Sequence, residues 1–68
     1  MAGWLKNDLI YSHIKVTIPA GTFIEFKRLD GYGDFMQITG PDEYAENELC
    51  FILEFTELTP IEWLKIKG

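Results

Sequence analysis

The sequence predicts an all-β fold: a small, single-domain antiparallel barrel or bent sheet of four to five strands. Short runs in which apolar and polar residues alternate with period two, many of them β-branched, predict the strands. Glycine and proline separate these runs about every eight to twelve residues, as is typical of small β domains. One domain is expected over residues 1–68, because an apolar fraction of 47% and ten aromatic residues (two Trp, three Tyr, five Phe) supply a core.

The first two runs predict a hairpin. Residues 9–18 alternate as one strand, and its expected core positions are Ile10, Ile14, Val16 and Ile18. A turn follows at Pro19-Ala20-Gly21, because proline fixes φ and glycine tolerates positive φ. Residues 22–28 alternate again, with Ile24 and Phe26 on the expected core face.

The middle of the chain predicts two further strands. Residues 29–34 form a turn-rich tip, and residues 35–39 form a strand that Gly40-Pro41 ends, because proline has no amide donor. Residues 42–48 form an acidic loop with room for one helical turn. Residues 49–55 are apolar on both faces for most of their length, which is typical of the central, most buried strand.

The tail fits two structures. Thr59-Pro60-Ile61-Glu62 matches a capping box, and a helix could run from it to Lys67 and stop at Gly68. Alternatively, one 3₁₀ or short helical turn near residues 60–63 leads into a closing strand over 63–66. We favour the second, because a lone two-turn helix is marginal in water and a small sheet gains from closure.

The order of these elements is a long hairpin, a third strand, a buried strand, one tight turn and a short last strand. This order resembles SH3-like barrels at the level of architecture. The resemblance implies a fold and carries no function, because unrelated functions share such barrels.

Little in the sequence indicates catalysis. We expect the single cysteine, Cys50, to be buried and inert, and the single histidine, His13, to lie partly exposed on a polar strand face, so the two form no nucleophile–base pair. Asp30 and Asp34, and the acids of residues 42–48, lack the spacing of a cation loop. We therefore expect no enzyme activity, no metal and no cofactor.

The composition also bears on location. No run approaches the roughly 20 apolar residues of a membrane helix, and the N-terminal residues are too polar and too short for a signal peptide. With a single cysteine, these features predict a cytoplasmic protein with no membrane partner.

Charge is distributed unevenly. Residues 1–28 hold four basic and two acidic residues (+2), and residues 29–68 hold two basic and nine acidic residues (−7), which sum to −5. Carboxylates interleaved with aromatic residues suit a basic partner surface. Tyr32, between two glycines, is either displayed or folded back onto the sheet. The candidate partner-binding residues are Tyr32, Asp34, Asp42, Glu43, Tyr44, Glu46, Glu48, Glu54 and Glu57.

The two tryptophans lie near opposite ends of the chain. We expect Trp4 and Trp63 to pack together and cover an open edge. An exposed tryptophan would instead be the better binding candidate, because tryptophan is enriched at interface hot spots.

Three classes of function fit these observations. The leading hypothesis is a non-enzymatic protein that inhibits or modulates a larger protein through an acidic surface; a DNA mimic against a nucleic-acid-handling enzyme, encoded by a phage or mobile element, is its concrete form. The first alternative is an assembly subunit that forms homo-oligomers through strand edges and aromatic residues. The second is a barrel that binds single-stranded nucleic acid, which the net charge disfavours. Its face would comprise Tyr11, Lys15, Lys27 and Arg28.

Overall fold

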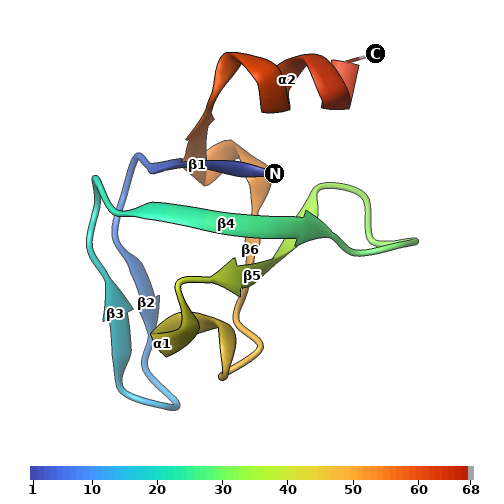
Figure 1. The fold of residues 1–68 in the computed structure, drawn as a ribbon. Coiled ribbons are helices and arrows are strands. Elements are labelled where there is room, and N and C mark those ends of the chain that lie inside the picture. The colour runs from blue at the N-terminus through green and yellow to red at the C-terminus, as the bar shows by residue number, and fades with distance from the viewer. Residues whose placement is uncertain (68) are drawn as a thin grey trace.

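The computed structural model describes residues 1–67, which fold into seven short strands and little helix (Figure 1). The elements are β1 (Ala2–Leu5), β2 (Leu9–Tyr11), β3 (Val16–Ile18), β4 (Phe23–Arg28), β5 (Phe35–Gly40), α1 (Asp42–Ala45), β6 (Cys50–Ile52), the 3₁₀ helix η1 (Leu53–Phe55), β7 (Thr56–Leu58) and α2 (Pro60–Lys67). Five strands form an antiparallel sheet in the order β6-β5-β4-β1-β7, and β2 pairs with β3 separately. The prediction of a mainly β fold is confirmed.

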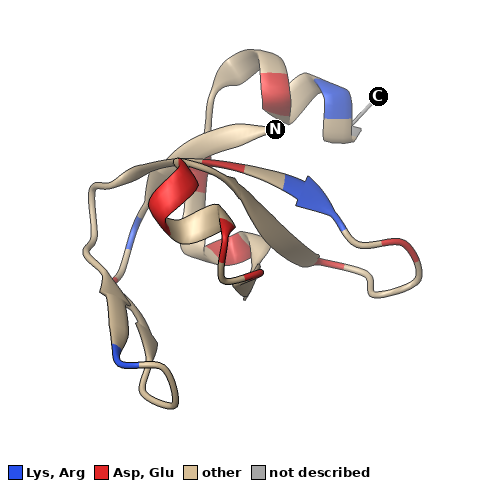
Figure 2. Ribbon diagram, turned by 60° about the horizontal axis from the view of Figure 1, so that its bottom comes forward, with Lys and Arg blue, Asp and Glu red and all other residues tan. Residues whose placement is uncertain are grey.

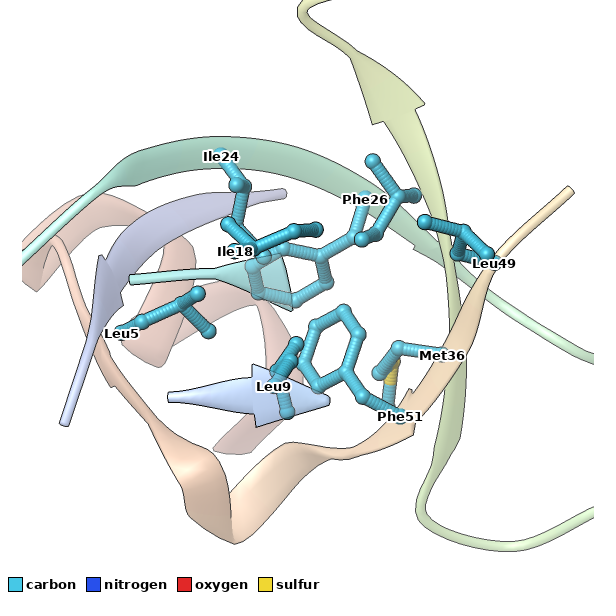
Figure 3. Close-up of a cluster of buried hydrophobic side chains, with 9 residues drawn as sticks. Leu5, Leu9, Ile18, Ile24, Phe26, Met36, Leu49 and Phe51 are labelled. Carbon is cyan, nitrogen blue, oxygen red and sulfur yellow. The ribbon is translucent and has the colours of Figure 1, made fainter. Parts of the chain in front are cut away.

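The core lies between one face of the five-stranded sheet and the β2–β3 hairpin (Figure 3). Phe26 and Phe51 meet edge to face with ring centroids 5.1 Å apart. The hairpin contributes Leu9 and Ile18, which are directly paired in its register. The buried apolar side chains are Leu5, Leu9, Ile18, Ile24, Phe26, Met36, Ile38, Leu49 and Phe51. We call the face of the five-stranded sheet that packs against this core the inner face, and the opposite face the outer face.

Local patterns correctly predict β4, β5 and the turn that precedes β4. Ile24 and Phe26 on β4 are buried, as their alternation predicts. Gly21 takes a positive φ of 85° in the predicted turn, where the Thr22 amide donates to the Pro19 carbonyl oxygen at 3.2 Å. The strand at β5 and a helical turn in the acidic loop, α1, are also confirmed.

The sheet is open, so of the two predicted forms, a barrel or a bent sheet, the barrel is wrong. Among the described residues, β6 and β7 are its two edges, and η1 connects them. Each edge strand has only three residues, and β6 and β7 lie at opposite edges of the sheet rather than pairing with each other. The SH3-like architecture is not confirmed, because the first hairpin stands outside the sheet.

The predicted strand over residues 9–18 is in fact a hairpin. The chain turns over residues 12–15, where Lys15 has a φ of 56°. The pairing explains the error: Leu9 and Ile18 have opposite parity and would face opposite sides of one strand, yet both enter the core across the turn. Ile10 is consequently 70% exposed rather than buried.

The predicted pairing of the first two runs is also wrong, because β4 pairs with β1 and β5 instead. The sequence pattern misses β1, whose four residues, Ala-Gly-Trp-Leu, include no β-branched side chain. Glycine is required at position 3 because the backbone of the neighbouring strand, β7, lies close to it. A Cβ at Gly3 would lie 3.1 Å from the Glu57 carbonyl carbon and 3.3 Å from the Leu58 Cα atom.

The apolar run over residues 49–55 is not the central strand. Its strand part, β6, is an edge, and the chain then turns through η1. Leu49 and Phe51 are buried, while Leu53 and Phe55 pack against the core half-buried. A turn, rather than burial of both strand faces, accounts for the continuous apolar sequence.

The tail forms a helix, so the favoured turn-and-strand alternative is wrong. α2 follows Thr59, whose Oγ1 accepts a hydrogen bond from the Glu62 amide at 3.4 Å, as a capping box predicts. The Glu62 carboxylate lies 3.6 Å from the Met1 amino group and 3.5 Å from the Lys65 Nζ atom. These contacts stabilise a helix that is too short to form alone.

Candidate partner-binding surface

A row of side chains crosses three strands on the outer face. Glu57 on β7 is directly opposite Trp4 on β1, and Trp4 is directly opposite Phe23 on β4. Directly opposite residues of antiparallel strands point to the same face, so the acid and both rings lie side by side. The rings pack edge to face with centroids 4.8 Å apart, and about half of each remains exposed, 45% for Trp4 and 42% for Phe23.

A groove of about 210 Å³ lies next to this row, lined by Phe23, Glu25 and Pro41. Phe23 and Glu25 are two residues apart on β4 and so share the outer face. Pro41 follows the last residue of β5, Gly40, which is in register with Glu25. The strand pairing therefore brings an aromatic ring, a proline ring and a carboxylate together.

The acidic segment begins at the end of the groove. Pro41 is the N-cap of α1, and Asp42 and Glu43 form the first turn of this helix. We call the following set the acidic–aromatic strip: Trp4, Phe23, Glu25, Pro41, Asp42, Glu43 and Glu57. Tyr44, which the sequence suggests as an aromatic anchor, instead packs half-buried against the core.

The carboxylates of the strip carry uncompensated charge. In the part of the chain that the structure describes, the ion pairs join Glu62 to the Met1 amino group and to Lys65. The four acids of the strip are exposed and take part in neither. Their negative charge is therefore open to a partner.

The other candidate residues lie elsewhere. Tyr32 is 67% exposed, so the loop displays it rather than folding it back. Asp34 immediately precedes β5, whereas Asp42 follows its end, and six extended residues span roughly 20 Å. Of the other candidate acids, all exposed, Glu46 and Glu48 follow α1 and Glu54 lies on η1. The predicted set thus does not form one patch. Asp42 and Glu43 of α1 belong to the strip together with Glu57. The β4–β5 loop, which holds Tyr32, stands apart from α1 (Figure 2).

Basic residues are distributed over separate elements. Figure 2 shows Lys and Arg segments between β1 and β2, at the β2–β3 turn, at the end of β4 and on α2. Lys15 lies in the hairpin turn, and Arg28 at the end of β4 donates to the Gly33 carbonyl oxygen at 2.9 Å. The face proposed for nucleic acid is therefore divided between a hairpin and the distant end of a sheet strand.

Cys50 is exposed, which contradicts the expectation of a buried thiol. It lies on an edge strand, and its Sγ donates to the Glu48 carbonyl oxygen at 3.7 Å. The Tyr11 hydroxyl donates to the Cys50 carbonyl oxygen at 2.7 Å. Burial, together with the nearby Cys50 thiol, raises the pKa of Tyr11 to about 12. The hydrogen bond between Tyr11 and Cys50 connects the β2–β3 hairpin to β6.

His13 lies exposed in the hairpin turn, with its ring centroid 6.4 Å from that of Tyr11. Neither His13 nor Cys50 lines the groove. Within residues 1–67, no group of three or more His, Cys, Asp or Glu side chains is placed to hold a metal ion. The lining of the groove, two rings and one carboxylate, holds no cysteine or histidine nucleophile.

The tryptophans occupy different elements. Trp4 packs against Phe23, and Trp63 lies on α2 with 47% of its surface exposed. Both tryptophans therefore meet the condition under which the sequence makes a tryptophan a binding candidate, and Trp4 is the one that lies in the strip. Phe23 and Glu25 were missed, although a signal exists: alternation in residues 22–28 places an aromatic side chain on the polar face.

Comparisons with protein-family models, with curated proteins and with solved structures gave no match. None of the described helices has the length and apolar content needed to cross a membrane.

Proposed function

We propose that this chain is a non-enzymatic protein that binds a basic surface on a larger protein through the acidic–aromatic strip. The observation that carries this proposal is the row Glu57–Trp4–Phe23 on the outer face. Two half-exposed rings there lie beside carboxylates that no described ion pair neutralises. Exposed aromatic residues mark interface hot spots, and the surrounding charge steers a partner of opposite sign.

The strip provides both elements of such an interface. Trp4 and Phe23 supply apolar area that loses little conformational entropy on binding, because both side chains already pack against each other. The acids beside these rings attract a basic site and disfavour acidic competitors.

The concrete form of the proposal is an inhibitor or modulator of a nucleic-acid-handling enzyme. The active sites of such enzymes are basic because they bind phosphates, and the strip would occupy such a site in place of nucleic acid, as a DNA mimic. Phages and mobile elements are the expected source of such a chain. Action in the cytoplasm agrees with the free, exposed Cys50 thiol, since free thiols persist where the environment is reducing.

The test is affinity capture from a lysate of the encoding organism, with quantitative mass spectrometry and two charge-reversal variants. The strip variant carries Glu25→Lys and Glu57→Lys; the control carries Asp30→Lys and Asp34→Lys in the β4–β5 loop. Each changes the net charge from −5 by +4 to −1, so only the position differs. We expect the strip variant to lose the partner and the control to keep it.

Loss of the partner by the control alone would place the binding surface at the β4–β5 loop and refute the strip. Equal retention by both variants would show that negative charge serves solubility only. A captured nucleic-acid-handling enzyme would then be assayed with added protein, and inhibition by the wild type but not by the strip variant is expected.

A second candidate function is self-association. Ile61 and Leu64, one turn apart on α2, are 68% and 62% exposed, and the sheet has two open edges, β6 and β7. Exposed edges and apolar side chains are surfaces on which copies of one chain assemble. Sedimentation at micromolar concentration tests this alternative: a monomer refutes it, and an oligomer that Leu64→Glu disperses supports it.

A further inference from the structure

The groove beside Phe23 combines two apolar walls with one anionic wall. Phe23 and Pro41 present rings, and Glu25 presents a carboxylate. Gly40 makes space for this carboxylate, because a Cβ at that position would lie only 2.7 Å from the Glu25 Oε2 atom. Glu25 is thereby accommodated against the end of β5 and next to the two rings.

The size of the groove indicates what it accepts. Ligand and cofactor sites measure roughly 300–1,000 Å³, and this groove measures about 210 Å³. It therefore has room for one long side chain rather than a cofactor. A side chain with an apolar stem and a cationic end matches its walls, because such stems lie along apolar surface while the charged head meets a carboxylate.

Glu25 is available for such a head group. Lys27, the next basic residue along β4, is in register with Gln37 on β5. No ion pair among the described residues joins Lys27 to Glu25. The added acids of α1, Asp42 and Glu43, lie just beyond Pro41 and increase the negative potential at this end of the groove.

We propose that the groove binds one arginine side chain of the partner, with its methylene stem on Phe23 and Pro41 and its guanidinium on the Glu25 carboxylate. This inference rests on the proposed function and names the group that the strip recognises. Arginine fits better than lysine, because its planar guanidinium stacks on aromatic rings and pairs with a carboxylate through two hydrogen bonds. Phe23, which lines the groove, provides such a ring.

The experiment is a titration of the ¹⁵N-labelled protein followed by two-dimensional NMR. The probes are acetyl-Gly-Arg-Gly-amide and the same peptide with citrulline, which is neutral and almost isosteric with arginine. We expect roughly millimolar binding of the arginine peptide, with shifts at the amides of Phe23, Glu25 and Asp42 and at the Trp4 indole. The citrulline peptide should bind roughly tenfold more weakly.

Two variants that each remove one carboxylate assign the effect. Glu25→Gln should reduce the affinity for the arginine peptide to that for citrulline, whereas Glu48→Gln, outside the groove, should change it by less than about twofold. Equal binding of both peptides, or equal losses from both variants, would overturn the inference. Its failure is distinguishable from failure of the proposed function. If the captured partner is lost by the strip variant but retained by Glu25→Gln, the groove is refuted and the strip stands.

Discussion

Replacement of Gly3 by alanine tests how β7 is attached to the sheet. A Cβ at Gly3 would lie 3.1 Å from the Glu57 carbonyl carbon and 3.3 Å from the Leu58 Cα atom, and its distance to the Glu57 carbonyl oxygen would fall below 3.0 Å. These are backbone atoms of a paired strand, so no side-chain rotation relieves the contact. β7 has to move away from β1.

The expected cost follows from the hydrogen bonds that bracket this contact. The Lys6 amide donates to the Phe55 carbonyl oxygen at 2.8 Å, and the Thr59 amide donates to the Ala2 carbonyl oxygen at 3.4 Å. Weakening two such bonds costs about 1 kcal/mol each. The resulting value of about 2 kcal/mol falls within the range for overpacked sites and lowers the Tm of a domain this small by roughly 8–16 °C.

The assay is thermal and urea unfolding followed by far-ultraviolet circular dichroism, with Gly40→Ala as the matched control. A Cβ at Gly40 meets the end of the flexible Glu25 side chain at 2.7 Å, which can rotate away. We expect the control to remain within about 0.5 kcal/mol of the wild type. Equal stabilities for Gly3→Ala and the wild type, or equal losses for both variants, would refute the β1–β7 contact as described.

Three further variants test other parts of the fold. Phe26→Ala removes the centre of the core and should lower the free energy of unfolding by about 3–5 kcal/mol, a large part of the total stability. Circular dichroism at 37 °C should then show mainly unfolded chain. A native spectrum would contradict this packing. Thr59→Ala removes the N-cap of α2 and should destabilise that helix by about 1 kcal/mol, seen as faster amide exchange in α2 with β4 unchanged. Tyr11 should ionise near pH 12 by absorbance at 295 nm, a step that Tyr11→Phe abolishes. Because folding raises the pKa of Tyr11 from 10.0, the neutral hydroxyl contributes its full stability below pH 10. That stability is lost as the pH rises towards 12. If the unfolding of Tyr11→Phe were equally pH-dependent, the hydrogen bond would be contradicted.

Sequence reasoning succeeds in this chain where one local pattern decides the structure. β4 alternates over most of its length, and a glycine or proline stands near the ends of both β4 and β5, so their existence and the buried face of β4 were predictable. The wrong predictions share one cause: the structure of those segments depends on which strands they pair with. Leu9 and Ile18 reach the same core only because a turn intervenes, and β1 exists because β4 and β7 pair with it on either side.

The candidate surface, like the fold, was predictable from the sequence only in part. The acids at the start of α1 and Glu57 were predictable from clustered charge, whereas the groove was not. Phe23 and Pro41 are 18 positions apart in the sequence (41 − 23), and the β4–β5 register brings them together. An aromatic residue on the polar face of a predicted strand was the one local sign of the groove.

Hydrogen exchange of the captured complex, read by mass spectrometry against the free protein, tests the binding surface most directly. Slower exchange is expected in β1, in the first half of β4 and in α1, three elements that carry most of the acidic–aromatic strip. Protection confined to the β2–β3 hairpin or to the loop around Tyr32, with those three elements unchanged, would show that the partner docks elsewhere.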